Sequence, residues 1–172
     1  RSIDYARRKD QERDRLSEEL WFCRRNRSDP LNSKTADDMG IVMSTSHHEP
    51  MARNHQEWTR NGKQYGGVWD YNKNPEGLQK FFREGIERAK DTEDIITIGM
   101  RGDGDAELAG SDEDNIRMME GLFEDQRQII KEVTGKKPNQ TPQVWALYKE
   151  VQTYYNKGLR VPDDVIILLS DD

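Results

Sequence analysis

Four clusters of polar side chains each follow a short apolar run in this sequence of 172 residues. The clusters lie at residues 47–49, 101–105, 149–150 and 170–172, and they contain two adjacent histidines, an arginine, a lysine and several carboxylates. If the apolar runs are parallel strands, their carboxyl ends meet at one edge of a sheet, where such sheets bind ligands. The spacing therefore predicts one shared site.

Paired carboxylates on different strands suit hydrolysis of a glycosidic bond, because one protonates the leaving oxygen and the other activates water or attacks carbon. Asp103 or Asp105, after the second run, and Glu150, after the third, give such a pair. Gly102 and Gly104 can turn the chain tightly and present the aspartates directly after a rigid strand. We predict a glycosidase site whose catalytic candidates are Asp105, Glu150 and Asp103.

Other side chains in these clusters could bind the sugar. Arg101, Lys149 and the histidines would supply positive charge for an acidic sugar. Trp69, Tyr71 and Trp145 could stack on sugar faces, although aromatic residues near strand ends are more often core. The predicted substrate-binding residues are Arg101, His47, His48, Glu49, Trp145, Lys149 and Asp171.

Metal binding is an alternative use of the acidic loop and the histidines. The loop at 101–105 lacks the EF-hand register, because Glu107, Asp112 and Asp114 do not supply the later calcium ligands. A zinc site usually draws its ligands at wider spacing than 47–49. We therefore expect no metal and no other cofactor, and we keep a metal-dependent hydrolase and a non-catalytic carbohydrate-binding remnant as alternatives.

Composition excludes several classes of protein. The 27 basic and 33 acidic residues give a net charge of −6, the opposite of what a nucleic-acid binder needs. No apolar run approaches the roughly 18 residues of a membrane span. The single cysteine, Cys23, excludes an internal disulfide framework and a cysteine-built zinc site. We expect neither a nucleic acid nor a membrane as partner.

Short apolar runs bounded by turn residues are typical of strands covered on both faces. They lie at 40–43, 94–99, 143–148 and 165–169. Helical spacing predicts helices over 75–90, 112–133 and 151–156. Asn74 is the expected N-cap of the first helix and Ser111 that of the second, which Gly135 should end. The alternation predicts an α/β fold with about four parallel strands and intervening helices. An open sheet and half of an eight-stranded barrel fit this periodicity equally well.

Residues 1–30 differ from the rest because they are dense in charge and show no convincing helical repeat. Over the whole chain the hydrophobic share is 33% and the mean hydropathy is −1.08. This is lean for a self-sufficient globular domain. We therefore separate a divergent charged segment, 1–30, from the alternating part, 31–172, and we interpret the chain as an excerpt of a longer one.

Several stretches, in order along the chain, resemble glycoside hydrolase family 115, the xylan α-1,2-glucuronidases. The matching stretches are 36–43 continuing into 45–51, 82–88, 98–105, 125–127, 143–151 and 155–164. Joined motifs of this length are specific, whereas the Gly-Asp-Gly-Asp run alone would not be. The resemblance implies that 31–172 is a partial (β/α)8-type barrel, the incomplete catalytic domain of a large multidomain enzyme.

The resemblance also implies an activity. The parent enzyme would remove glucuronic or 4-O-methylglucuronic acid side groups from glucuronoxylan or its acidic oligosaccharides, with inversion. The family's acidic pair maps best onto Asp105 and Glu150, with Asp103 a close second to Asp105. The aspartate would be the general acid and Glu150 the base, or the reverse. Arg101 would bind the uronate carboxylate, and residues 47–49 would line the sugar pocket.

Two departures from the family pattern qualify these expectations. Within residues 1–30 only Leu20-Trp21 looks familiar, and the family continues beyond Asp172. A barrel cannot close on four strands, so open edges and an uncovered core should remain. We therefore predict that this chain alone has little or no activity. The family likeness implies an extracellular or periplasmic location, and it predicts no oligomeric state.

Overall fold

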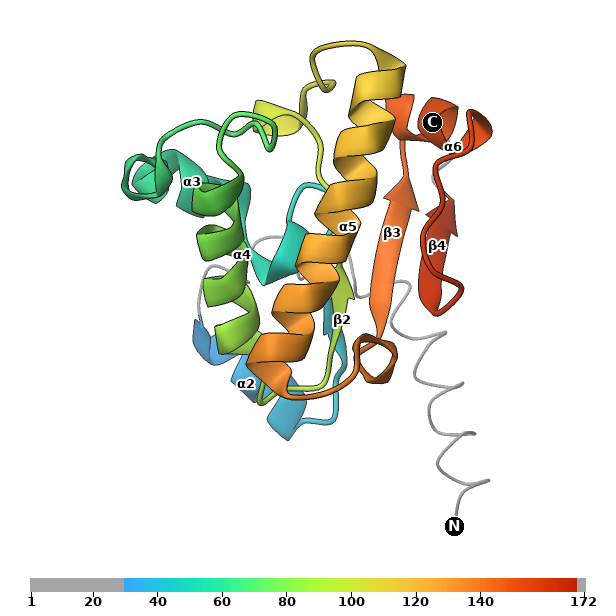
Figure 1. Ribbon diagram of the computed structural model, residues 1–172. Coiled ribbons are helices and arrows are strands. Elements are labelled where there is room, and N and C mark those ends of the chain that lie inside the picture. Colours follow the sequence, from blue (N-terminus) through green and yellow to red (C-terminus); the bar gives the residue numbers. More distant parts are fainter. Residues whose placement is uncertain (1–29, 170–172) are drawn as a thin grey trace.

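The computed structural model describes residues 30–169, with side chains from residue 33 onward. It contains one parallel sheet of four strands, which lie side by side in chain order (Figure 1). The strands are β1 (Met43–Ser44), β2 (Asp94–Thr97), β3 (Gln143–Leu147) and β4 (Val165–Leu169). The helices are α2 (Pro30–Asp38), α3 (His55–Asn61), α4 (Pro75–Ala89), α5 (Asp112–Thr134) and α6 (Glu150–Asn156). Four short 3-10 helices, η1 (Pro50–Ala52), η2 (Gly62–Tyr65), η3 (Asp103–Asp105) and η4 (Pro138–Gln140), occupy the connections.

The predicted α/β fold with four parallel strands and intervening helices is confirmed. The order β1-β2-β3-β4 has no reversal, whereas a doubly wound open sheet reverses its strand order at a switch point. Sequential parallel order is the arrangement in the wall of a (β/α)8 barrel. The topology therefore favours the partial barrel over the open sheet.

The two long helices begin and end for local reasons. Ser111 caps α5 by accepting a hydrogen bond from the Asp114 amide, and Gly135 ends it with a φ of 68°. Pro75 begins α4 and Asn74 occupies its N-cap position, as predicted, but the Asn74 side chain makes no capping hydrogen bond. That amide donates instead to the backbone oxygens of Tyr65 and Val68, and so fixes the loop before the helix.

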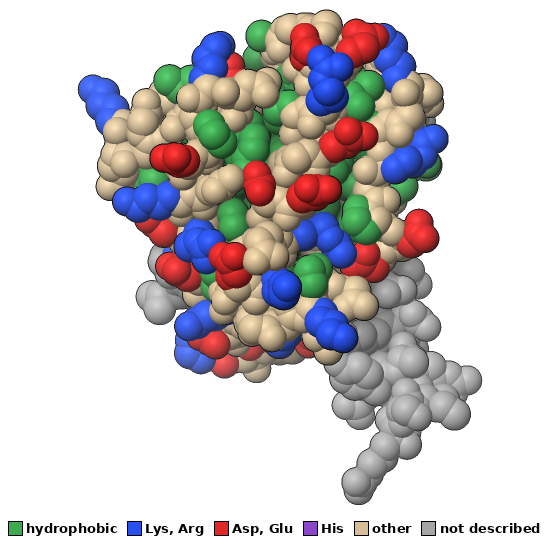
Figure 2. Space-filling view, viewed as in Figure 1, with side chains coloured by type: hydrophobic (Ala, Val, Ile, Leu, Met, Phe, Trp, Pro, Cys, Tyr) green, Lys and Arg blue, Asp and Glu red, His purple; other side chains and the backbone are tan. Residues whose placement is uncertain are grey.

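The core lies between the sheet and the pair α4 and α5, which pack side by side across it (Figure 1). Both helices turn an apolar stripe inward, and each fully buried side chain contributes about 1.5–3 kcal/mol. The buried apolar residues of these helices include Leu78, Phe81, Phe82, Ile86, Met119, Leu122, Phe123 and Ile130. The opposite, outer surface of the two helices carries Lys, Arg, Asp and Glu side chains that intermix without a large patch of either sign (Figure 2).

The strand β4 leaves apolar side chains uncovered on both faces. Ile166 and Leu168 point to one face and Ile167 and Leu169 to the other, and their exposed fractions are 47%, 55%, 39% and 77%. This agrees with the open edge and uncovered core expected of an incomplete barrel.

Charge on β4 should reduce self-association of the chain. We expect Ile167→Lys combined with Leu169→Lys to lower the apparent mass in sedimentation velocity, because a long apolar edge strand pairs readily with other chains. Met39→Lys is the matched control, since Met39 is 72% exposed but lies outside the sheet. A wild-type chain that is monomeric at millimolar concentration would contradict the prediction.

Some predictions differ from the structure or lie outside it. Sequence periodicity missed α2 and α3, and the strand predicted at 40–43 is shorter and later, at Met43–Ser44. Of the charged segment 1–30 only Pro30 belongs to the described residues, and Asp171 also lies outside them. Between residues 30 and 169 no helix is long and apolar enough to cross a membrane.

Candidate active site

Arg101 connects the carboxyl ends of β2 and β3. Its Nε and Nη2 atoms donate to the two carboxylate oxygens of Glu150 at 3.0 and 2.8 Å. Its Nη1 atom donates to the carboxylate and, at 2.7 Å, to the backbone oxygen of Asp105. The Arg101 side chain is only 4% exposed. The structure thus brings together three of the predicted site residues, around one guanidinium group.

This arrangement keeps the guanidinium charged. Burial alone would lower the pKa of Arg101, but its contacts with Glu150 and Asp105 raise it above its usual value. A buried arginine with two carboxylate partners is a fixed, two-sided clamp, because the planar fork sets the directions of its hydrogen bonds. Arg101 therefore fixes where the two carboxylates lie relative to each other.

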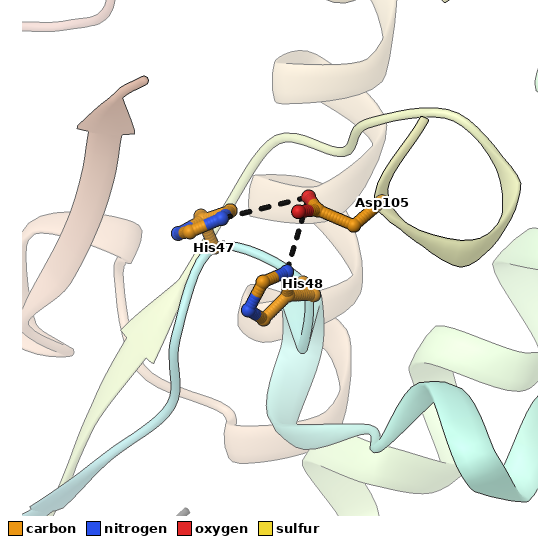
Figure 3. A group of neighbouring side chains, drawn as sticks. All are labelled: His47, His48 and Asp105. Carbon is orange, nitrogen blue, oxygen red and sulfur yellow. Dashed lines mark ion pairs between the residues drawn. The ribbon is translucent and has the colours of Figure 1, made fainter. Parts of the chain in front are cut away.

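Asp105 also faces the two adjacent histidines. His48 Nδ1 lies 3.0 Å and His47 Nε2 3.5 Å from the same carboxylate oxygen of Asp105 (Figure 3). Partial burial alone would raise the pKa of Asp105, but the hydrogen bonds and charges of His48 and Arg101 lower it below its usual value. Asp105 is consequently ionised at neutral pH in this site.

The histidines converge because they lie in a turn and not in a regular strand or helix. Their rings are 3.9 Å apart, and the ring of His47 also lies 4.4 Å from that of Tyr148. Tyr148 in turn contacts Arg101 and Lys149, with each cationic centre 5.0 Å from its ring. Tyr148 is therefore a member of the site that the sequence analysis missed, although it directly precedes the predicted Lys149.

Left-handed backbone conformations are concentrated in the site loops. The described residues other than glycine with positive φ are Met51, Ala52, Asp105 and Lys149. Lys149, with φ 49° and ψ −125°, turns the chain out of β3 so that Glu150 begins α6. Such conformations are costly for residues with a Cβ and are held in place by their surroundings. They place the Asp105 and Glu150 side chains toward Arg101.

Asp103 lies apart from this group. Its side chain is 70% exposed and pairs with His55 Nε2 at 3.0 Å. The Gly104 amide nitrogen also lies 3.2 Å from this histidine nitrogen, so His55 packs against the loop that carries Asp105. The geometry favours Asp105 over Asp103 as the partner of Glu150. His55 was missed by the sequence analysis, although the capping box of Asn54 and Glu57 marks the start of its helix.

Trp145 lies in the core and not among the polar side chains at the carboxyl edge of the sheet, so it is not available to stack on a substrate as predicted. It is 2% exposed and packs against Phe123 and Tyr155 in the core. Alternation along β3 turns its side chain toward α5. Glu49 is buried and Lys149 is exposed, and both lie in the loops that form the site. A groove of about 1050 Å³ lies at the amino ends of β3 and β4 and includes none of the site residues.

A metal ion has one candidate position in the described part of the chain. Ligand atoms of His47, His48 and Asp105 lie within 4.8 Å of one another, so adjacent histidines can converge in spite of their close spacing. Imidazole and carboxylate are zinc ligands. Arg101, however, donates to the same oxygen of Asp105 that faces both histidines, so a cation there would lie beside a guanidinium charge. This repulsion favours hydrogen bonding over metal binding.

Zinc should therefore leave the thermal stability of the chain unchanged. We expect no shift of the unfolding midpoint with excess ZnCl₂ or with excess chelator, measured by differential scanning calorimetry. A ligand at 100 times its Kd would stabilise the fold by about 2.7 kcal/mol, which such a measurement detects easily. A zinc-dependent rise in the midpoint that His47→Ala abolishes would establish a metal site and refute this prediction.

Comparisons with known proteins support the fold and identify the family. The solved structure of a family GH115 4-O-methyl-α-glucuronidase with specificity for decorated arabinogalactans is similar to this chain, with a TM-score of 0.72 and 37% identity. The match covers 79% of this chain and 18% of that one, so this chain spans about a fifth of that enzyme. A search of curated proteins finds no match. The model of Glycosyl hydrolase family 115 matches residues 16–172, beginning within the charged segment, and the chain belongs to this family.

Proposed function

We propose that this chain forms part of the catalytic domain of an inverting α-glucuronidase that removes glucuronic or 4-O-methylglucuronic acid side groups from glucuronoxylan. One observation carries the proposal: Asp105 and Glu150, from the ends of neighbouring strands, bind the same guanidinium group. Inverting glycosidases need two carboxyl groups about 6.5–9.5 Å apart, with room for a water. Because the two carboxylates bind different nitrogen atoms of one guanidinium group, their positions relative to each other are fixed.

Arg101 would act mainly on the two carboxylates. Its Nε, its Nη1 and one side of its Nη2 already donate to Glu150 and Asp105, which leaves little donor capacity for a sugar carboxylate. We assign the uronate instead to Lys149 and the histidines, which lie around the same edge. That Arg101 binds the uronate, as the family resemblance implies, stays a prediction.

The proton for the leaving group must come from one of the two carboxyls. Asp105 is ionised in the ligand-free site, and this favours it as the base, opposite to the order that the family resemblance favours. A bound uronate adds negative charge nearby, and a like charge raises the pKa of a carboxyl group. Substrate binding would therefore help one carboxyl to acquire the proton it delivers.

The test is release of free uronic acid from glucuronoxylan by this chain and by a longer enzyme that contains it. We expect turnover by the longer enzyme and little or none by the chain alone, because β4 leaves its apolar side chains uncovered. Decorated arabinogalactan, the substrate named for the similar structure, is the comparison substrate. Brisk turnover by the chain alone would contradict the prediction that it is inactive. No turnover of either polysaccharide by the longer enzyme would contradict the proposed α-glucuronidase function.

A further inference from the structure

Gln126 holds the backbone directly before Arg101. It lies on α5 and is fully buried, with 0% of its surface exposed. Its side-chain oxygen accepts from the Gly99 amide at 2.7 Å, and its side-chain nitrogen donates to the Gly99 oxygen at 3.1 Å. One amide side chain thus satisfies both backbone groups of one residue.

This contact replaces the neighbouring strand at the end of β2. The ladder continues to Ile98, whose amide donates to the Val144 oxygen at 2.9 Å. At Gly99 the backbone takes a φ of 88° and leaves the ladder, and its two polar groups bind Gln126 instead. A Cβ at position 99 would lie 3.0 Å from the Trp145 ring, so the chain turns in a tightly filled space. Gln126 therefore sets the direction in which the chain leaves the sheet.

A second side chain fixes the other end of this short segment. The Trp69 indole nitrogen donates to the Arg101 backbone oxygen at 2.8 Å. Met100, between the two anchored residues, is 3% exposed. The backbone on both sides of Met100 is thus held by side chains from other parts of the fold.

We propose that Gln126 is a positioning residue of the active site, which acts by placing the Arg101 guanidinium between Asp105 and Glu150. Bidentate contacts tolerate only small displacements, because the guanidinium fork and the carboxylate must stay nearly coplanar. Loss of the Gln126 amide would leave two buried backbone groups of Gly99 without partners, and the segment would shift to satisfy them. The placement of Arg101 by Gln126 does not depend on the proposed function, whereas its effect on turnover rests on that function.

The experiment measures the pKa of the Asp105 carboxyl by NMR titration of the full 172-residue chain. We expect Gln126→Met to raise this pKa by about one unit, because Asp105 loses part of its contact with the Arg101 charge. Gln143→Met is the matched control. Gln143 is also fully buried and donates to the backbone oxygens of Pro138 and Thr141, but it lies at the amino end of β3. It should destabilise the fold and leave the Asp105 pKa unchanged.

A milder variant keeps the test decisive if Gln126→Met does not fold. Trp69→Phe keeps an aromatic ring but removes the N–H that binds the Arg101 oxygen together with the second ring of the indole, and it should raise the Asp105 pKa by a smaller amount. An unchanged Asp105 pKa in both site variants, or an equal shift in Gln143→Met, overturns the positioning role. The titration needs no turnover, so failure of the proposed function would appear separately, as a lack of uronic acid release.

Discussion

Replacing Arg101 with methionine is expected to lower the free energy of unfolding by about 3 kcal/mol, measured by urea denaturation at pH 7. The substitution removes the shared partner of Asp105 and Glu150, whose side chains are 26% and 11% exposed. Removing one member of a buried ion pair costs about 3–5 kcal/mol, because the other charge is left without compensation. We expect the lower end of that range, since Asp105 keeps access to water and its contact with His48.

The free energy of unfolding that Arg101→Met loses should decrease at acidic pH. The pKa of Asp105 in the folded chain lies below its usual value of 3.8. A carboxyl group with a lowered pKa contributes stability that is fully present above the unfolded-state value and is lost as pH falls through the folded-state value. The difference between wild type and Arg101→Met should therefore be constant near neutral pH and shrink below pH 3.8.

A surface arginine provides the control for this variant. Arg117 is 71% exposed and its one ion pair among the described residues is with the nearby Asp114, so Arg117→Met should leave the urea midpoint unchanged. An Arg101→Met chain as stable as wild type at pH 7 would show that the clamp does not hold the site together. A deficit that persists at pH 2 would assign the loss to packing of the side chain and not to its charge.

The fold could be predicted from the sequence because its main elements are strongly apolar segments. The stripes on α4 and α5 are dictated by burial. They and the apolar run at β4 lie almost where the sequence pattern predicts them. The helix α3 was missed because Trp58 is its only buried residue, which leaves no periodic signal. The predicted strand 94–99 ends earlier, at Thr97, because Gly99 bonds to Gln126 and not to a strand, and no local pattern reveals such a distant partner.

The site could be located from the sequence but its internal contacts could not. Polar residues after parallel strands meet at one edge by topology, so the convergence of Asp105 and Glu150 needed no knowledge of side chains. The contact of both carboxylates with Arg101 depends on positive φ angles at Asp105 and Lys149. Neither residue is a glycine, so the sequence gives no sign of these backbone conformations. For the same reason the sequence favoured Arg101 as a ligand of the substrate, whereas its contacts are with the carboxylates.

Neutral replacements of the two carboxylates should abolish most of the turnover of a longer enzyme that contains this chain. We expect Asp105→Asn and Glu150→Gln each to lower kcat on glucuronoxylan by about 10²–10⁴, the usual contribution of a general acid or base. Asp103→Asn is the matched control, because Asp103 lies in the same short 3-10 helix as Asp105 but is 70% exposed and pairs with His55. It should retain kcat within about a factor of three, since its side chain is not part of the clamp.

An aryl glucuronide with a good leaving group separates acid from base. Such a substrate needs little protonation, so the variant that lacks the acid should regain most of its kcat, while the variant that lacks the base should not. Recovery in Glu150→Gln would assign the acid to Glu150, in line with the low pKa of Asp105, and recovery in Asp105→Asn would assign it to Asp105. Unchanged turnover of glucuronoxylan in Glu150→Gln would remove Glu150 from the mechanism. If Glu150→Gln loses turnover but still binds the sugar, Glu150 acts in catalysis and the site is more than a carbohydrate-binding pocket.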